Sequence, residues 1–370
     1  MADADVLVVG TGPAGGMAAW MAAKEGAKVV VVDRKKVVGE PVRCAEGTFS
    51  SLLSLFDLHE GKWISNHYNT AVIKHKGMKD IRVSPKTLRG VSLDRVLFEQ
   101  EICRRAKEEG AEIVLGKSVV SLQGGEAVLE DGTSISARVV VGADGVESMI
   151  GRWAGMLEPL GMDDIASAVQ YVMEDGDWKG DTAEMILGRE EAPNGYIWIF
   201  PKSDKRANVG AVTTPSTGKN AKTLLDDFIA SRLSGAKTVS KTCGCVPVAP
   251  PLSKVVKDNV VLVGDSARFA SAFGAGGIHS AMFSGAVAGR LSARCAYTKD
   301  LKLLEEYDHI MKKSLYKNLM RSYRIKTRTY GSDKGMKRTL RLFRIGGKLI
   351  THIPIDPMGF WWGRLDKYVR

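Results

Sequence analysis

Three glycines near the N-terminus, Gly10, Gly12 and Gly15, are spaced so that backbone N–H groups could surround a phosphate. In such a turn the first glycine permits the bend, the second lets the backbone approach a pyrophosphate, and the third lets a helix pack against a strand. Asp33 lies 23 residues beyond Gly10, where its carboxylate could accept hydrogen bonds from a ribose. The pattern therefore predicts a dinucleotide-binding site.

The residues around these glycines predict the elements that such a site requires. The apolar run 6–10 predicts a buried parallel strand, a helix follows from Ala14, and residues 28–32 predict a second strand that leads into Asp33. The helix N-terminus would offer free N–H groups and the positive end of its dipole to the phosphates. A strand–helix–strand unit with no ligand is the alternative.

Composition limits the class of protein. The chain has 370 residues, enough for two domains, and a net charge of +11. Its five cysteines do not form a dense disulfide framework, which is typical of a reducing cytoplasm. Only one residue separates Cys243 from Cys245, so a zinc pair is not expected and we predict no metal. We expect neither a signal peptide nor a membrane-spanning segment.

The positive charge is concentrated near the C-terminus. Residues 312–348 contain thirteen Lys or Arg and one acid, Asp333, and apolar side chains alternate with them. Phe360, Trp361 and Trp362 add aromatic surface in the tail. This combination favours an anionic membrane surface, with the protein peripheral on its cytoplasmic face. A helical region with a charged exterior is the alternative, and nucleic acid is not favoured.

Later segments predict a second sheet and a return to the first. Residues 63–91 have the pattern of short strands, Ser92 is predicted to cap the helix that follows, and residues 165–215 alternate like antiparallel strands. The run 259–265 predicts another parallel strand. We therefore expect an α/β fold: a discontinuous nucleotide-binding domain (1–62, 88–155 and 243–298), an inserted antiparallel β-sheet domain (63–87 and 156–242), and a basic helical region (299–370).

Three motifs in this order resemble those of FAD-dependent enzymes with the para-hydroxybenzoate hydroxylase fold. They are the N-terminal glycine turn, the segment 144–148 that begins Asp-Gly, and Val-Gly-Asp at 263–265, which is followed by Gly-Gly-Ile at 276–278. The resemblance implies a Rossmann-like domain that binds FAD, with the start of the last helix facing the flavin ring. It implies these cofactor-binding residues: Gly10, Gly12, Ala14, Gly15, Asp33, Arg34, Cys44, Ala45, Gly47, Arg95, Val119, Asp265, Gly276, Gly277 and Ile278.

Two further stretches resemble the geranylgeranyl reductase family, in particular the archaeal enzymes of membrane-lipid synthesis. They are Pro-Val-Arg-Cys-Ala-Glu-Gly at 41–47 and Tyr-Ile-Trp-Ile-Phe-Pro at 196–201, and the segment 151–155 is also similar. The resemblance implies a reductase that saturates C=C bonds of isoprenoid chains on archaeal ether-lipid precursors. This chain has Ser271 and Ala272 where the family tends to have Asp-Pro, and Ala275 where it has glycine.

The aromatic stretch and one cysteine are the candidates for the substrate site. Tyr196, Trp198, Phe200 and Pro201 would offer ring surface to an extended apolar chain, although aromatic residues on a strand can also simply pack a core. An isolated alkene carbon must receive a proton in a dry site, and we predict that Cys44 donates it. A packing cysteine is the alternative for Cys44. His279 is a weaker candidate for proton transfer.

Two other functions remain open. A flavin-dependent monooxygenase or halogenase of the same fold would use a stretch that residues 195–201 partly match, and a flavoprotein that only binds lipid is the third possibility. No second glycine turn of the first type follows. We therefore expect an external electron donor, which could be ferredoxin, transiently bound NAD(P)H or another reduced carrier.

Overall fold

The computed structural model describes residues 3–84 and 89–352. Its first sheet is mainly parallel and has the strand order β17-β18-β11-β1-β2-β8, with β9 and β10 continuing from β11. The bounds are β1 Ala4–Val9, β2 Val29–Asp33, β8 Glu112–Leu115, β9 Val119–Gln123, β10 Glu126–Leu129, β11 Ser134–Gly142, β17 Val256–Lys257 and β18 Val260–Leu262. The central strands are rich in valine, and their valines are buried, as expected for a sheet covered on both faces.

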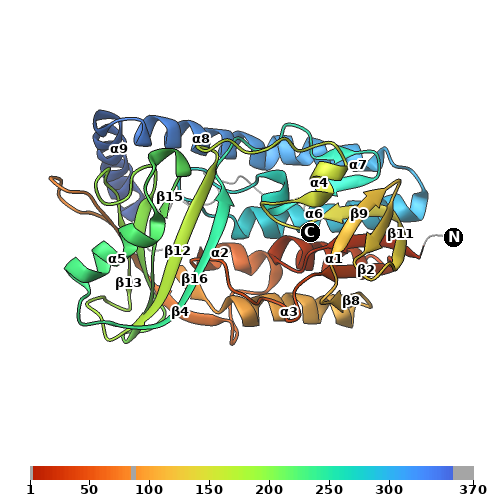
Figure 1. Cartoon of the computed structure of the whole chain (residues 1–370), viewed down its shortest axis with the longest axis horizontal. Helices are drawn as coiled ribbons and strands as arrows, with labels where there is room; N and C mark the ends of the chain where they lie inside the picture. Colours follow the sequence, from red (N-terminus) through yellow and green to blue (C-terminus); the bar gives the residue numbers. More distant parts are fainter. Residues whose placement is uncertain (1–2, 85–88, 353–370) are drawn as a thin grey trace.

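Two helices pack unusually closely beside this sheet. They are α1 (Pro13–Lys24) and α6 (Ile278–Thr298), and α3 (Arg95–Glu108) lies against α1 (Figure 1). A Cβ atom on Gly285 or Gly289 of α6 would overlap the backbone carbonyls of Ala14 and Ala18. These two glycines therefore let the backbones of α1 and α6 come into contact.

Most of the second sheet is the green layer of Figure 1, and its strand order is β16-β12-β15-β14-β13-β5-β6. Its bounds are β5 Thr70–Lys74, β6 Ile81–Val83, β12 Ile165–Glu174, β13 Thr182–Ile186, β14 Tyr196–Pro201, β15 Arg206–Thr213 and β16 Lys237–Pro247. One face packs on α5 (Ala221–Arg232) through residues such as Tyr171, Ile199 and Val209. The other face carries Tyr196 and Trp198 and contacts the C-terminal helices.

A small third sheet, β3-β7-β4, joins the two larger layers. Its strands are β3 Gly47–Phe49, β4 Ile64–Tyr68 and β7 Gly90–Leu93; α2 (Ser50–Leu53) and a 3-10 turn, Ser54–Phe56, follow β3. The prediction that Ser92 caps the next helix is wrong. Ser92 lies inside β7, and the Asp94 side chain caps α3 by accepting a hydrogen bond from the Leu97 N–H. Strand pairing keeps Ser92 extended, so the helix begins three residues later.

The C-terminal helices run along one side of the molecule, over both large sheets (Figure 1). They are α7 (Leu303–Met311), a π-helical turn Lys312–Tyr316, α8 (Lys317–Tyr330) and α9 (Asp333–His352). The buried Lys326 of α8 donates to the backbone oxygens of Asp163 and Val248, which attaches α8 to the antiparallel sheet. Burial lowers the pKa of this lysine.

The remaining short helices are α4 (Met149–Trp153) and the 3-10 turns Pro215–Thr217 and Gly264–Ala267. The expected α/β class, with an inserted antiparallel sheet and a helical C-terminal part, is confirmed. β16 continues beyond residue 243, the predicted domain boundary, and remains in the antiparallel sheet until Pro247. In the described part of the chain no helix combines the length and apolarity needed to cross a membrane. The aromatic tail, Phe360 to Trp362, lies outside the described residues.

Candidate active site

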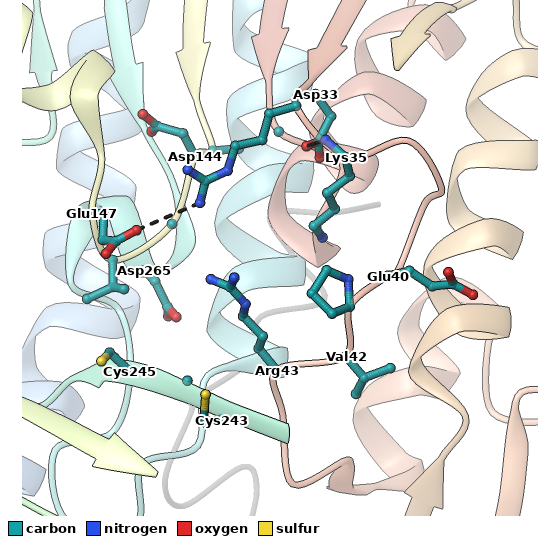
Figure 2. Close-up of a pocket in the computed structure, with 18 of the residues that line it drawn as sticks. Asp33, Lys35, Glu40, Val42, Arg43, Asp144, Glu147, Cys243, Cys245 and Asp265 are labelled. Atoms are coloured by element: carbon teal, nitrogen blue, oxygen red, sulfur yellow. Dashed lines mark hydrogen bonds and ion pairs between the residues drawn. The ribbon is translucent and has the colours of Figure 1, made fainter. Parts of the chain in front are cut away.

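A cavity of about 1550 Å³ lies between the carboxyl ends of the parallel strands and the edge of the antiparallel sheet. Figure 2 shows Asp33 and Asp144 above it, Arg43 pointing into it from below, and Cys243 and Cys245 on the strand that borders it. Ligands of doubly wound folds bind at such strand ends. This cavity is therefore the candidate cofactor site.

The glycine turn borders the cavity as predicted. Gly10 has φ +108°, which favours glycine, and a Cβ atom on Gly12 would meet no heavy atom within 4 Å. Gly12 is the N-cap of α1, and no side chain caps the helix there. The first N–H groups of α1 are therefore left for a phosphate, as the positive dipole end requires.

Asp33 holds this turn in place. Its Oδ2 accepts hydrogen bonds from the Thr11 N–H at 2.7 Å and the Thr11 hydroxyl at 2.6 Å, and Oδ1 accepts from the Lys35 N–H at 2.9 Å. A carboxylate can accept about four hydrogen bonds, so one site remains for a ribose hydroxyl. The sequence predicted only the ribose contact and did not reveal that Asp33 also fixes Thr11.

Asp144 also acts on the protein itself. Its carboxylate accepts hydrogen bonds from Ser148 and from the N–H groups of Met149 and Ile150. The Ser266 hydroxyl, which accepts a hydrogen bond from the Gly145 N–H at 2.9 Å, lies 3.2 Å from Asp144 Oδ1. The middle motif and the last motif are thus joined directly, although about 120 residues separate them.

Arg95 reaches the cavity from the first turn of α3. Its guanidinium is paired with the buried Glu99, while its Nε, also buried, has no hydrogen-bond partner in the described structure. Burial lowers the pKa of Arg95, but the combined effect of Glu99 and Cys44 raises it by more, so the net shift of the pKa is upward. Asp265 lies nearby: burial raises its pKa to about 6, and Arg95 opposes that shift.

Two other predicted cofactor residues line the cavity near its opening. The exposed Arg34 faces Glu147 across it, with 3.7 Å between the guanidinium and the carboxylate (Figure 2). Val119 is half-buried at the start of β9. Ala14 and Gly15 lie in the first turn of α1, but neither is a lining residue.

The predicted flavin-ring contacts lie at the start of α6. Gly277 is the N-cap of this helix, and a Cβ atom placed on it would lie 3.1 Å from Asp265 Oδ1. Gly276 and Ile278 flank it. The unexpected Ala275 adopts a left-handed conformation, with φ +51°, where a glycine would be free of strain. Burial lowers the pKa of the adjacent His279 to about 3, and its Nε2 lies 2.5 Å from the Thr48 hydroxyl.

The turn that precedes α6 (residues 271–277) is held from outside. The Tyr196 hydroxyl donates to the Gly274 carbonyl at 2.6 Å, and the Tyr330 hydroxyl donates to that of Phe273 at 3.1 Å. The Ser322 hydroxyl of α8 accepts from the Phe273 N–H at 3.0 Å and lies 2.8 Å from the Ser271 hydroxyl. Ser271 stands where the family that this sequence resembles tends to have aspartate, and its hydroxyl has a partner in α8.

The aromatic strand β14 lies behind this turn. Tyr196 and Trp198 are buried and Phe200 is half-buried, with ring centroids 5.9 Å and 6.4 Å apart along the strand. The Trp198 indole donates to Gln170 at 3.1 Å. These rings pack with Tyr330, Met336 and Leu340 of the C-terminal helices and do not line the 1550 Å³ cavity. Pro201 ends the strand, and its carbonyl accepts from Asn66. Their role in binding substrate stays a prediction.

Cys44 lies in a loop that we call the Cys44 loop (residues 40–46). This loop borders the candidate cofactor cavity at residues 40–43 and the aromatic strand β14 at Ala45. The Cys44 Sγ accepts a hydrogen bond from the Glu46 N–H at 3.2 Å, and its carbonyl accepts from Gln170 at 3.2 Å. Cys44 is half-buried and also close enough to Tyr196 to influence it electrostatically. Ala45 packs beside the aromatic strand, and Gly47 faces the Phe200 ring.

The residues at the cavity fit FAD. The open space at Gly12, the uncapped start of α1 and the unpaired Nε of Arg95 supply the donors that a pyrophosphate requires. Asp33 retains an acceptor for a ribose. No cluster of three or more His, Cys, Asp or Glu residues suited to a metal ion occurs among the described residues.

Comparisons with known families agree with this geometry. The family model "FAD dependent oxidoreductase" matches residues 5–147, and "Geranylgeranyl reductase catalytic domain" matches residues 164–246. A digeranylgeranylglycerophospholipid reductase of Methanocella arvoryzae is 36% identical over 342 residues, which cover 87% of this chain and 86% of that protein. One from Methanosphaerula palustris is 34% identical over 346 residues, which cover 87% and 85%.

Solved structures extend the comparison to the fold. The crystal structure of a geranylgeranyl bacteriochlorophyll reductase-like protein from Thermoplasma acidophilum matches with a TM-score of 0.86 and 27% identity, over 98% of both chains. A flavin-dependent brominase matches with a TM-score of 0.72 over 99% of this chain and 97% of its own, but at 16% identity it shares the fold alone. FAD is the cofactor of the fold described here, and the chain belongs to the geranylgeranyl reductase family.

Proposed function

We propose that this protein is an FAD-dependent reductase that saturates C=C bonds of geranylgeranyl chains on archaeal ether-lipid precursors. The observation that carries the proposal is the position of the Cys44 loop: residues 40–43 line the candidate cofactor cavity, and Ala45 packs with the buried aromatic residues of β14. The identity to digeranylgeranylglycerophospholipid reductases over most of both chains supports the same substrate class.

The residues divide the chemistry as follows. The residues at the cavity would hold FAD, which when bound and reduced would provide the hydride for one alkene carbon. We propose that the Cys44 thiol supplies the proton to the other carbon. The Glu46 backbone N–H donates a hydrogen bond to this sulfur, and Arg95 lies close to it. Trp198 and Phe200 would exclude water and hold the isoprenoid chain against the Cys44 loop.

Product analysis tests the function. FAD-loaded protein, reduced with dithionite under anaerobic conditions, should add mass in steps of two hydrogens to digeranylgeranylglycerophospholipid, as measured by mass spectrometry. A monooxygenase or halogenase would instead consume oxygen when lipid is added. A protein that only binds lipid would return the lipid unchanged, and its reduced flavin would not reoxidise faster.

We also propose a peripheral location on an anionic membrane surface. The exposed residues of α9 include Lys334, Arg338 and Arg341, and after them Leu342 and Ile345 are each 60% exposed. Basic and apolar side chains on one helical face are suited to anionic lipid head groups. A membrane location would also bring the isoprenoid substrate to the protein.

Electrons must reach FAD from outside the chain. We propose an external carrier, which could be ferredoxin, NAD(P)H or another reduced carrier, because the sequence has no second dinucleotide motif. Anaerobic stopped-flow measurement of flavin bleaching with each donor distinguishes the first two. Saturable bleaching by NADPH alone would favour the nicotinamide.

A further inference from the structure

Glu46 is a buried carboxylate beside Cys44 that no part of the proposed reaction uses. The residue is only 4% exposed, although it lies in a loop. Its backbone has φ +66°, a left-handed conformation that is uncommon for a residue other than glycine. Such a conformation persists where surrounding contacts determine it, so the contacts of Glu46 identify what the loop is held against.

The carboxylate of Glu46 joins three elements. Oε2 accepts hydrogen bonds from Nζ of Lys202, the residue after β14, at 2.8 Å and from Nδ2 of Asn208 in β15 at 2.7 Å. Oε1 accepts from the Arg95 N–H at 2.9 Å, at the start of α3. One side chain therefore ties the Cys44 loop to the sheet of the aromatic residues and to the helix of the cofactor arginine.

The backbone of the same loop is fixed in parallel. The Glu46 N–H donates to Cys44 Sγ at 3.2 Å, and its carbonyl accepts from the Leu93 N–H at 2.8 Å. Asn208 also donates to the Ala45 carbonyl at 3.2 Å, while Gln170 holds that of Cys44. Contacts on both sides of the Cys44 thiol therefore fix its backbone, and one of the residues that make them, Asn208, also holds the Glu46 carboxylate.

We propose that Glu46 is a positioning residue that fixes the Cys44 thiol at the junction of the cofactor and substrate sites. The proposal rests on the proposed function in which Cys44 donates a proton. A buried ion pair is weak evidence for stability, because desolvation offsets much of its attraction. The Glu46–Lys202 pair therefore serves geometry, since it sets one orientation of the loop relative to two separate layers.

Activity and thiol reactivity together test the proposal. Glu46→Ala in FAD-loaded protein should lower kcat for the lipid by about 100-fold, the effect of a displacement of roughly 1 Å, with the lipid KM nearly unchanged. Glu46→Gln should lose less, because Asn208 can rotate and present its unpartnered Oδ1 to the new amide. The Glu46→Gln variant also keeps the proposal testable if the Glu46→Ala protein does not fold.

A double-mutant cycle separates positioning from a general loss of structure. If Glu46 acts through Cys44, the variant with both Glu46→Ala and Cys44→Ala should be no slower than Cys44→Ala alone. The matched control is Glu184→Ala: this carboxylate also pairs with two cations, Lys74 and Arg232, but on another strand of the same sheet. Its kcat should equal that of the unchanged protein.

A second measurement does not require turnover. The rate of iodoacetamide modification at Cys44, resolved from the other four cysteines by peptide mass spectrometry, should change several-fold in Glu46→Ala and remain unchanged in Glu184→Ala. Three results would each overturn the proposal. The modification rate and kcat could be unchanged in Glu46→Ala, the losses of kcat in the cycle could be additive, or Glu184→Ala could lose as much kcat as Glu46→Ala. If the unchanged protein reduced no lipid, the proposed function would fail, while the modification rates would still decide the role of Glu46.

Discussion

The Cys44 thiol has polar neighbours, and the residue also packs against the apolar core of the parallel domain. The Glu46 N–H donates to it, and the Arg95 guanidinium lies close by, whereas Cys103 and Cys295 are buried within the helices of the parallel domain. A thiol held by hydrogen bonds has a defined direction, which proton transfer requires.

Replacing this thiol should affect turnover and spare the cofactor. We expect Cys44→Ala to lower kcat by about 100-fold, the usual contribution of a general acid, while the flavin absorbance per protein is retained. Cys295→Ala is the control for loss of a cysteine. Full turnover in Cys44→Ala would remove this residue from the mechanism.

His279 should act on acid stability and not on catalysis. Its enclosure lowers its pKa from 6.5 to about 3 in the folded protein. Between these values the unfolded chain binds the extra proton, so the free energy of unfolding should fall as the pH drops from 6.5 towards 3, by at most about 1.4 kcal/mol per pH unit. In His279→Gln this contribution should be absent. Denaturant titrations of both proteins at several pH values measure it, and parallel curves would contradict it.

At the scale of elements, α8 supports the turn that starts α6. Ser322 and Tyr330 hold the backbone of residues 271–277, and the rings of Phe273 and Tyr330 stack with centroids 5.6 Å apart. Phe343 of α9 packs edge-on against Phe273 at 5.5 Å. The C-terminal helices therefore support the predicted flavin contacts, although they are remote from them in sequence.

Loss of one of these supports should weaken the binding of FAD. Ser322→Ala removes the acceptor of the Phe273 N–H, at a cost of about 1 kcal/mol, and we expect FAD affinity to fall about fivefold in fluorescence titrations. Thr327→Ala, on the exposed side of the same helix, is the control. Equal affinities in the two variants would show that α8 does not support the turn.

At the scale of the whole molecule, α9 has two apolar faces with different surroundings. Met336 and Leu340 are buried in the core cluster that contains Trp198, whereas Leu342 and Ile345 point outward among basic side chains. A helix that only covers a core would have no need of the second apolar face. The proposed membrane surface would occupy it.

Charge reversal on this outward face should weaken vesicle binding. We expect the double variant Arg338→Glu and Arg341→Glu to bind anionic phosphatidylglycerol vesicles at least about tenfold more weakly, since each basic residue contributes about 1 kcal/mol. Sedimentation with vesicles measures it. Lys299→Glu with Lys302→Glu changes the charge equally on another exposed segment and is the control. Equal loss in both pairs would indicate a response to net charge alone.

The sequence by itself determined the local features of this protein. The glycine turn, the strand that ends on Asp33, the aromatic strand and the strand before Asp265 were all predicted, because each depends on neighbouring residues and a short periodic pattern. The helix start was misplaced at Ser92, because strand pairing overrides the local capping preference. Family resemblance added FAD and the reductase class.

The tertiary structure decided which of these features meet. The Glu46–Lys202 contact spans 156 positions, and the Ser271–Ser322 contact joins a turn to a helix of another region. Contacts of this kind follow from how layers pack and leave no periodic signal in a single sequence. For the same reason the support of the flavin turn by α8, and the close approach of α1 to α6 at Gly285 and Gly289, emerged only from the folded chain.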